Sequence, residues 1–127
     1  MVRGRKPETA IAEAKKFAGR MGYRTQDNPY DDLGYDFLIF KKDSFRAVRV
    51  RQTRYRIESE PLYGDLFPDE VRDLCDLPFP DFIIRELWLR TQHERTWRRL
   101  EVYDFGVTEI EWWKPDGYTN PYARKGS

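Results

Sequence analysis

Two runs rich in β-branched and aromatic residues, at 35–40 and 45–57, constrain this chain most, and the polar segment Lys41–Ser44 separates them. Such residues favour extended backbone, and a short polar segment between two such runs favours a turn. The sequence therefore predicts an antiparallel hairpin with a long second strand. A chain of 127 residues can build one hydrophobic core around it, and an aromatic content of 16% argues against a disordered chain.

A helix and a short strand are predicted before the hairpin. Pro7 and Glu8 suit the first turn of the helix, and Gly22 follows its last apolar position. Tyr23–Gln26 then favours a short strand, and residues 27–34, rich in Asp, Asn, Pro and Gly, favour a loop. The apolar residues that recur at helical spacing are Ala10, Ile11, Ala14, Phe17, Ala18 and Met21.

A second, shorter helix is predicted after the hairpin, beginning at Pro68. Two strands follow it, at 82–90 and 97–104, and residues 107–113 favour one more strand at a sheet edge. The order is therefore helix, three strands, helix and two or three strands. This order predicts an α/β fold with a mixed β-sheet flanked by two α-helices.

One domain is predicted at residues 1–113, because no repeat or long linker divides it, and 114–127 favours an irregular tail. No apolar run reaches the roughly 18–20 residues that cross a bilayer, and no apolar stretch follows the basic N-terminal residues. The single cysteine, Cys75, cannot form an intramolecular disulfide. These features predict a soluble, cytoplasmic protein without a membrane partner.

Positive charge is concentrated in the first half of the chain. Residues 1–57 contain 14 Lys and Arg against 7 Asp and Glu, whereas residues 58–127 contain 9 against 15. A basic half is typical of a surface that binds polyanions, but folding can also mix the two halves into an ordinary charged surface. Both interpretations stay open at this point.

Two short motifs accompany this order of elements: Gly34-Tyr35-Asp36-Phe37 and Arg49-Val50-Arg51-Gln52-Thr53. Together with the order, they resemble the PD-(D/E)XK nuclease superfamily of restriction endonucleases and Holliday-junction resolvases, over about residues 8–90. The resemblance implies a restriction-endonuclease-like sheet with the order α-β-β-β-α-β-β. It also implies a carboxylate early in a strand, which is Asp36, and a helix carboxylate, for which Glu8 and Glu13 are the candidates.

The chemistry of that superfamily uses two carboxylates to hold a divalent cation beside the scissile phosphate, and a lysine two residues after the second to orient water. In this chain Arg49 stands at the second carboxylate position and Arg51 at the lysine position. Two permanently charged guanidinium groups near Asp36 disfavour a cation. We therefore expect a degenerate metal centre and no cofactor.

Arginines on one strand face can instead bind phosphate, because planar guanidinium groups make bidentate, charge-assisted hydrogen bonds to its oxygens. We expect Arg49 and Arg51 to bind nucleic acid or another phosphate-bearing partner, with Lys41, Lys42 and Arg46 as further candidates. Arg46 has the opposite strand parity, so one groove cannot use every basic residue. The alternative is that these arginines protect a strand edge or form surface ion pairs.

Two other functions stay open, so the sequence does not decide whether the protein is an enzyme. If Asp31, Asp32 or Glu58 replaces the missing acid, the protein is a magnesium-dependent endonuclease, with Asp36 as metal ligand and Arg51 in place of the lysine. Such residues equally suit loops and caps. Otherwise the fold is a scaffold that forms a homodimer through its C-terminal strands and tryptophans.

Overall fold

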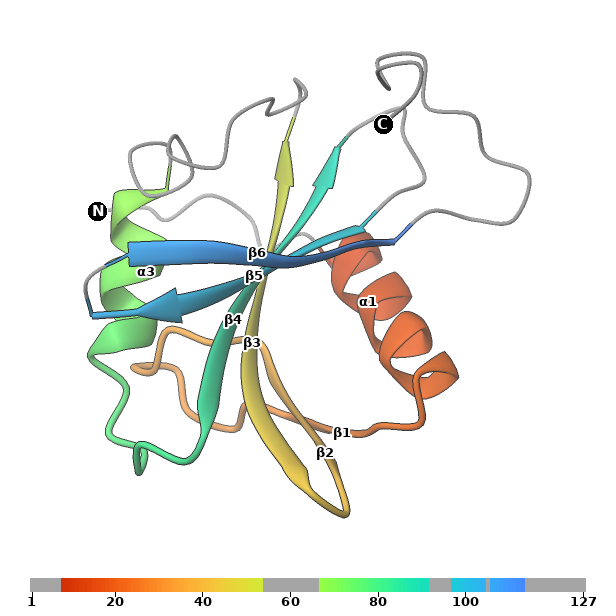
Figure 1. The fold of residues 1–127 in the computed structure, drawn as a ribbon, viewed down its shortest axis with the longest axis horizontal. Coiled ribbons are helices and arrows are strands. Elements are labelled where there is room, and N and C mark those ends of the chain that lie inside the picture. The colour runs from red at the N-terminus through yellow and green to blue at the C-terminus, as the bar shows by residue number, and fades with distance from the viewer. Residues whose placement is uncertain (1–7, 54–66, 92–96, 105, 114–127) are drawn as a thin grey trace.

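The structure, a computed structural model, describes residues 8–53, 67–91, 97–104 and 106–113. Within these ranges the chain has an α/β fold, in which the helices flank one mixed β-sheet (Figure 1). In chain order the elements are α1 (Glu8–Arg20), β1 (Arg24–Asp27), β2 (Phe37–Lys41), β3 (Ser44–Thr53), α3 (Pro68–Cys75), β4 (Ile84–Thr91), β5 (Trp97–Tyr103) and β6 (Gly106–Trp113).

The six strands lie in the sheet in the order in which they occur along the chain. β3 and β4 are parallel, and every other neighbouring pair is antiparallel. A parallel pair needs a long crossover connection, and α3 lies on that connection. Figure 1 shows α1 and α3 on opposite sides of the sheet, so the predicted mixed sheet between two helices is confirmed.

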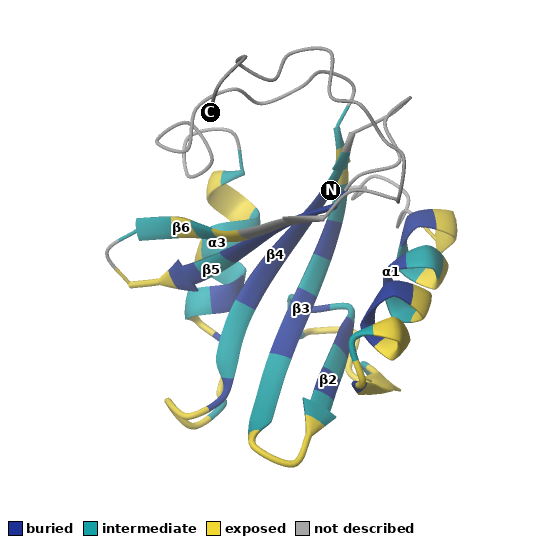
Figure 2. Ribbon diagram, turned by 45° about the vertical axis from the view of Figure 1, so that its right-hand side comes forward, coloured by how far each residue is buried: buried dark blue, intermediate teal, exposed yellow. Residues whose placement is uncertain are grey.

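One face of the sheet is covered by α1, whose apolar stripe is buried at Ala10, Ala14, Phe17 and Ala18 (Figure 2). The Phe17 ring packs edge-on against Trp88 of β4, with centroids 5.5 Å apart. After the helix the backbone of Gly22 has a φ of 89°, a left-handed conformation that glycine adopts at low cost. The predicted helix and its end are both confirmed.

The other face is covered by α3, which contributes the fully buried Leu74. Side chains along β3 alternate between the two faces, as expected for a strand. Ala47 packs in the cluster on the α3 side, whereas Val48 and Val50 pack in the cluster on the α1 side. The long strand of the hairpin is therefore covered on both faces.

Observed strand boundaries differ from the predicted ones by one or two residues, and the turn of the hairpin contains only Lys42 and Asp43. β6 forms an edge of the sheet, as predicted for residues 107–113. The predictions for Pro7, for the end of the long strand at 54–57 and for the tail at 114–127 lie outside the described residues. In the described ranges, no helix is long and apolar enough to cross a membrane.

Candidate phosphate-binding face

Arg49 and Arg51 lie on the α3 side of β3, as their strand parity predicts, and each faces an acidic residue of α3. Arg49 Nη1 lies 3.9 Å from Oδ2 of Asp73, and Arg51 Nε lies 3.9 Å from Oε1 of Glu70. Both distances exceed the range of a hydrogen bond. The carboxylates therefore balance the charges of the two guanidinium groups without saturating their N–H donors.

The Nε atom of Arg51 shows this most clearly. It is buried, and within the described residues it has no hydrogen-bond partner, although 37% of the Arg51 side chain is exposed. A buried donor without an acceptor costs about 1–3 kcal/mol. The exposed part of the Arg51 side chain, rather than the buried Nε atom, is the part that an oxyanion can reach.

The acidic partners come from the local structure of α3. Acidic residues in a first helical turn are stabilised by the helix dipole, which explains Glu70. Asp73 follows three residues later and so lies on the same face. Glu70 is 13% exposed and Asp73 25%, because both lie between the helix and the sheet. Neither residue was predicted as a site residue, although their spacing on a predicted helix was a usable signal.

The loop before β2 closes over the pair formed by Arg49 and Asp73. A Cβ atom at Gly34 would lie 2.5 Å from Cβ of Asp73 and 3.2 Å from Nη1 of Arg49, so only glycine fits here without a shift. Asn28 holds the loop in place. Its Nδ2 donates to the carbonyl oxygens of Leu33 and Tyr35, at 3.0 and 2.8 Å.

Asp36 lies at the start of β2, where β3 extends beyond its partner strand. Its backbone N–H donates to the carbonyl oxygen of Val48 at 2.8 Å. Its Oδ2 then accepts a hydrogen bond from the backbone N–H of Val50 at 2.6 Å. The ladder between β2 and β3 ends at Phe37 and Val48. The Asp36 carboxylate therefore accepts the hydrogen bond that the Val50 N–H of the longer strand β3 cannot make to β2.

The remaining basic candidates lie elsewhere. Lys41 and Lys42 are exposed at the hairpin turn, and Lys41 Nζ lies 4.3 Å from the centroid of the Tyr23 ring. Arg46 points to the α1 side, where its Nη1 donates to Oε2 of Glu86 at 3.0 Å. The structure thus brings Arg49 and Arg51 together and separates them from Arg46.

The two helix carboxylates also separate from each other. Glu8 is exposed in the first turn of α1. Glu13 forms an ion pair with Arg90 of β4. Asp31 and Asp32 are exposed in the loop before β2. Glu58, the other candidate for a displaced acid, lies outside the described residues. Across the described ranges, no three His, Cys, Asp or Glu side chains lie together in a group that could hold a metal ion.

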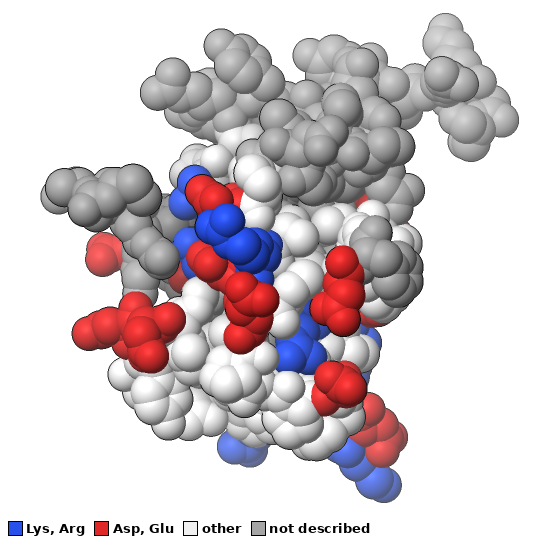
Figure 3. Space-filling view, turned by 90° about the vertical axis from the view of Figure 1, so that its left-hand side faces the viewer, with Lys and Arg blue, Asp and Glu red and all other residues white. Residues whose placement is uncertain are grey.

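Basic and acidic side chains interleave on the side of the molecule where α3 lies (Figure 3). The basic half of the chain supplies Arg49 and Arg51 to this face, and the acidic half supplies Glu70 and Asp73. At this face the two halves therefore mix. No protein-family model matches the sequence, and no curated protein matches it significantly.

Proposed function

We propose that this protein is a PD-(D/E)XK-like domain with a degenerate metal centre that binds nucleic acid through Arg49 and Arg51. One observation carries the proposal: two guanidinium groups share one face of β3 while their acidic neighbours stay at 3.9 Å. Phosphate oxygens fit the unsatisfied donors, because they accept bidentate hydrogen bonds from arginine.

The order of the described elements supports the same proposal. One helix, three strands, a second helix and three further strands occur in that sequence, and the superfamily resemblance implies this order up to the fifth strand. Among the described strands, β3 and β4 form the parallel pair, and the crossover that joins them carries α3. The cytoplasmic location expected from the single cysteine is part of the proposal.

Charge explains why the face suits an anion better than a cation. At about 5 Å, each guanidinium repels a unit positive charge by roughly 3 kcal/mol at an effective dielectric constant of 20. A phosphate gains a similar attraction, but it competes with Glu70 and Asp73. Partly exposed ion pairs without ideal geometry contribute about 1 kcal/mol or less, so both pairs can open at small cost.

This competition gives a test with two opposite outcomes. Arg51→Ala should weaken binding of a fluorescein-labelled 20-nucleotide DNA and lower the slope of log K against log[salt] by about one. Glu70→Gln should strengthen binding, because it removes the competing charge. Fluorescence anisotropy between roughly 50 and 200 mM salt measures both effects.

The matched control is Arg24→Ala, which removes the same charge from an exposed position on β1. It should change binding less than Arg51→Ala does. Equal effects of the two arginine variants would mean that only the net charge matters. Unchanged binding by Glu70→Gln would contradict the proposed competition on the α3 side.

A magnesium-dependent endonuclease is the second candidate, and one observation favours it. Glu70 and Asp73 bring carboxylates next to the strand positions at which the second acid is missing. Single-stranded, double-stranded and branched DNA should then be cut in the presence of Mg²⁺ or Mn²⁺. Glu70→Gln combined with Asp73→Asn should abolish that cleavage. Intact substrates under every condition would end this alternative.

A homodimer through the C-terminal strands is a separate proposal. β6 is the last strand of the sheet, so a second copy can pair with its outer edge. The side chains of Trp112 and Trp113 lie outside the described part of the structure. Sedimentation at high micromolar concentration tests this proposal, and a monomer there would exclude it.

A further inference from the structure

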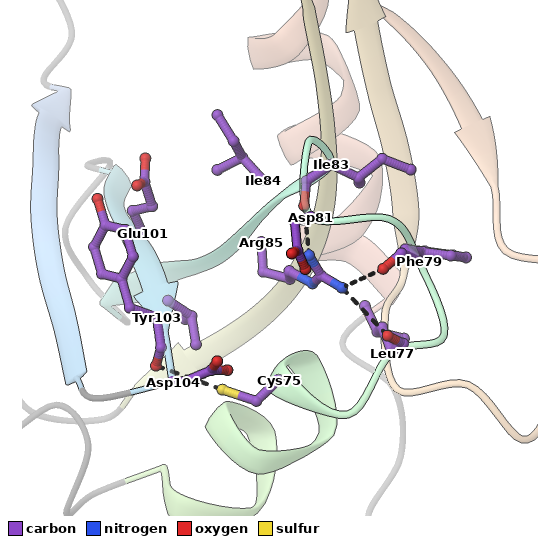
Figure 4. Close-up of a pocket in the computed structure, with 11 residues that line it drawn as sticks. Cys75, Leu77, Phe79, Asp81, Ile83, Ile84, Arg85, Glu101, Tyr103 and Asp104 are labelled. Atoms are coloured by element: carbon purple, nitrogen blue, oxygen red, sulfur yellow. Dashed lines mark hydrogen bonds between the residues drawn. The ribbon is translucent and has the colours of Figure 1, made fainter.

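A groove of about 390 Å³ opens between the end of α3, the loop after it and the strands β4 and β5 (Figure 4). Neither Arg49 nor Arg51 lines it, so it is distinct from the proposed phosphate-binding face. Apolar side chains form part of its wall, among them Leu77, Phe79 and Ile84. The groove therefore offers apolar surface that an aliphatic chain can cover.

Among the described residues that line the groove, Arg85 alone has a basic side chain, and all its donors are already used. An arginine side chain carries five N–H groups. Those of Arg85 point to five backbone carbonyl oxygens at 2.8–3.4 Å. The acceptors are the carbonyl groups of Leu74, Leu77, Phe79, Pro80 and Ile83. Arg85 therefore holds the loop after α3 and has no hydrogen left for a ligand.

The charged groups that remain are acceptors. Asp81, Glu101 and Asp104 line the groove with Arg85, whose donors are used. Glu101 also lies 3.8 Å from Nη1 of Arg46, so the negative charge of the groove rests mainly on Asp81 and Asp104. Figure 4 shows Glu101 and Tyr103 on one side of the groove and Asp81 on the other. A ligand that supplies donors and positive charge complements this surface, whereas an anion would meet repulsion.

Two titratable groups in the groove have a raised pKa, and neighbouring carboxylates contribute to both shifts. The pKa of the Cys75 thiol is raised, first by burial and then by the neighbouring carboxylates of Asp104 and Asp76. The pKa of the Tyr103 phenol is raised chiefly because its hydroxyl is hydrogen-bonded to Glu101. Both shifts have the direction that a negative environment produces.

The rim favours a macromolecule over a small cation. Phe82 lies in the sequence between the lining residues Asp81 and Ile83 and is 72% exposed. Tyr103, which lines the groove, is 37% exposed. Large exposed aromatic side chains beside a groove are typical of protein interaction sites. A peptide can cover Phe82 while one of its side chains enters the groove, whereas a ligand confined to the groove leaves Phe82 in water.

We propose that this groove binds an arginine or lysine side chain presented by a peptide segment of a partner protein. The aliphatic stem lies along the apolar wall near Ile84, and the cationic head meets the carboxylates of Asp81 and Asp104. The partner is thus a basic segment with an apolar neighbour that covers Phe82. This interaction is independent of nucleic-acid binding and can be tested without it.

The probe is a capped pentapeptide with a central arginine flanked by leucines, titrated into nitrogen-15-labelled protein. We expect the amide signals of Ile84, Tyr103 and Asp104 to shift. Asp104→Asn should weaken binding by roughly fivefold, the effect of losing one exposed charge contact. Asp43→Asn removes the same charge from the exposed hairpin turn and should leave the affinity unchanged.

A second variant separates the rim from the groove. Phe82→Ser should lower the affinity for the peptide, because the peptide reaches the rim of the groove. It should leave the lower affinity for free arginine amide unchanged, because that ligand does not reach the rim. The fold should tolerate this change at a largely exposed position. Arginine amide that binds as tightly as the peptide would overturn the choice of a peptide partner. The proposed binding site would be wrong if a peptide with a central glutamate bound as tightly as the arginine peptide. It would also be wrong if Asp104→Asn and Asp43→Asn changed the affinity equally.

Discussion

Arg99 donates two hydrogen bonds to Glu86, from Nε to Oε1 at 2.9 Å and from Nη2 to Oε2 at 3.1 Å, where the carboxylate is fully buried. Arg46 adds a bond to Oε2 at 3.0 Å, and the indole of Trp88 adds one to Oε1 at 2.9 Å. Both oxygens therefore have two donors, the condition under which a buried charge is tolerated. The Arg46 guanidinium is thus held within the fold on the α1 side.

Glu86→Gln should destabilise the protein by about 3 kcal/mol or more, because it leaves two guanidinium groups without their buried counter-charge. The free energy of unfolding in urea measures the loss. Asp69→Asn is the control, since Asp69 forms an exposed ion pair with Arg72 at 2.9 Å. That change should cost about 1 kcal/mol or less. Similar losses in the two variants would show that the buried network adds no special stability.

Gly34→Ala and Gly19→Ala should change stability in opposite directions. The added methyl group at Gly34 would meet Asp73 at 2.5 Å, so the loop must move away from α3, at a cost of about 1–3 kcal/mol. Gly19 lies in α1 with open space around it, and alanine there should add about 0.5 kcal/mol. Thermal unfolding of the two variants measures both effects. A neutral Gly34→Ala would mean that the loop does not need this close approach.

The order of the elements was predictable because its signals are local. The apolar spacing before Gly22 indicates α1, the polar segment Lys41–Ser44 indicates the hairpin, and Pro68 begins α3. Strand parity likewise placed Arg49 and Arg51 on one face. In these segments each residue type favours the conformation that the whole fold requires.

The partners of charged residues were not predictable in the same way. Glu86 is a charged residue, yet it is buried because helices and neighbouring strands cover β4 on both faces. Its partner Arg99 lies 13 residues away, and Arg49 meets Asp73 across the crossover. Such pairs depend on which elements lie side by side in the fold, and the local sequence pattern does not determine that.

Asp36→Ala should expose a backbone donor at the end of the hairpin. The Oδ2 atom of Asp36 accepts the Val50 N–H at 2.6 Å, and alanine offers no replacement. We expect faster hydrogen exchange at the Val50 amide and a loss of about 1–3 kcal/mol in the free energy of unfolding. Asp32→Ala, in the exposed loop before β2, should change neither quantity. Unchanged protection at Val50 in Asp36→Ala would contradict the capping role.

The raised pKa of Cys75 makes stability and reactivity depend on pH in a defined direction. Burial is the largest cause of the shift, and Asp104 and Asp76 act in the same sense. The unfolded chain therefore loses the thiol proton at a lower pH than the folded protein does. The contribution to stability is fully present below the ordinary cysteine pKa, and it is lost as the pH rises through the higher pKa of the folded state.

Alkylation by iodoacetamide tests the cause of this shift, because only the thiolate reacts. In native protein the rate should rise with pH along a curve displaced to higher pH than that of a small thiol. Asp104→Asn removes one of the two carboxylates that disfavour the thiolate and should move the curve of Cys75 back toward lower pH. Asp43→Asn, in the distant hairpin turn, should leave the curve in place. Because both variants keep the surroundings of the thiol nearly the same in shape, a curve unmoved by Asp104→Asn would show that the Asp104 carboxylate does not contribute to the raised pKa.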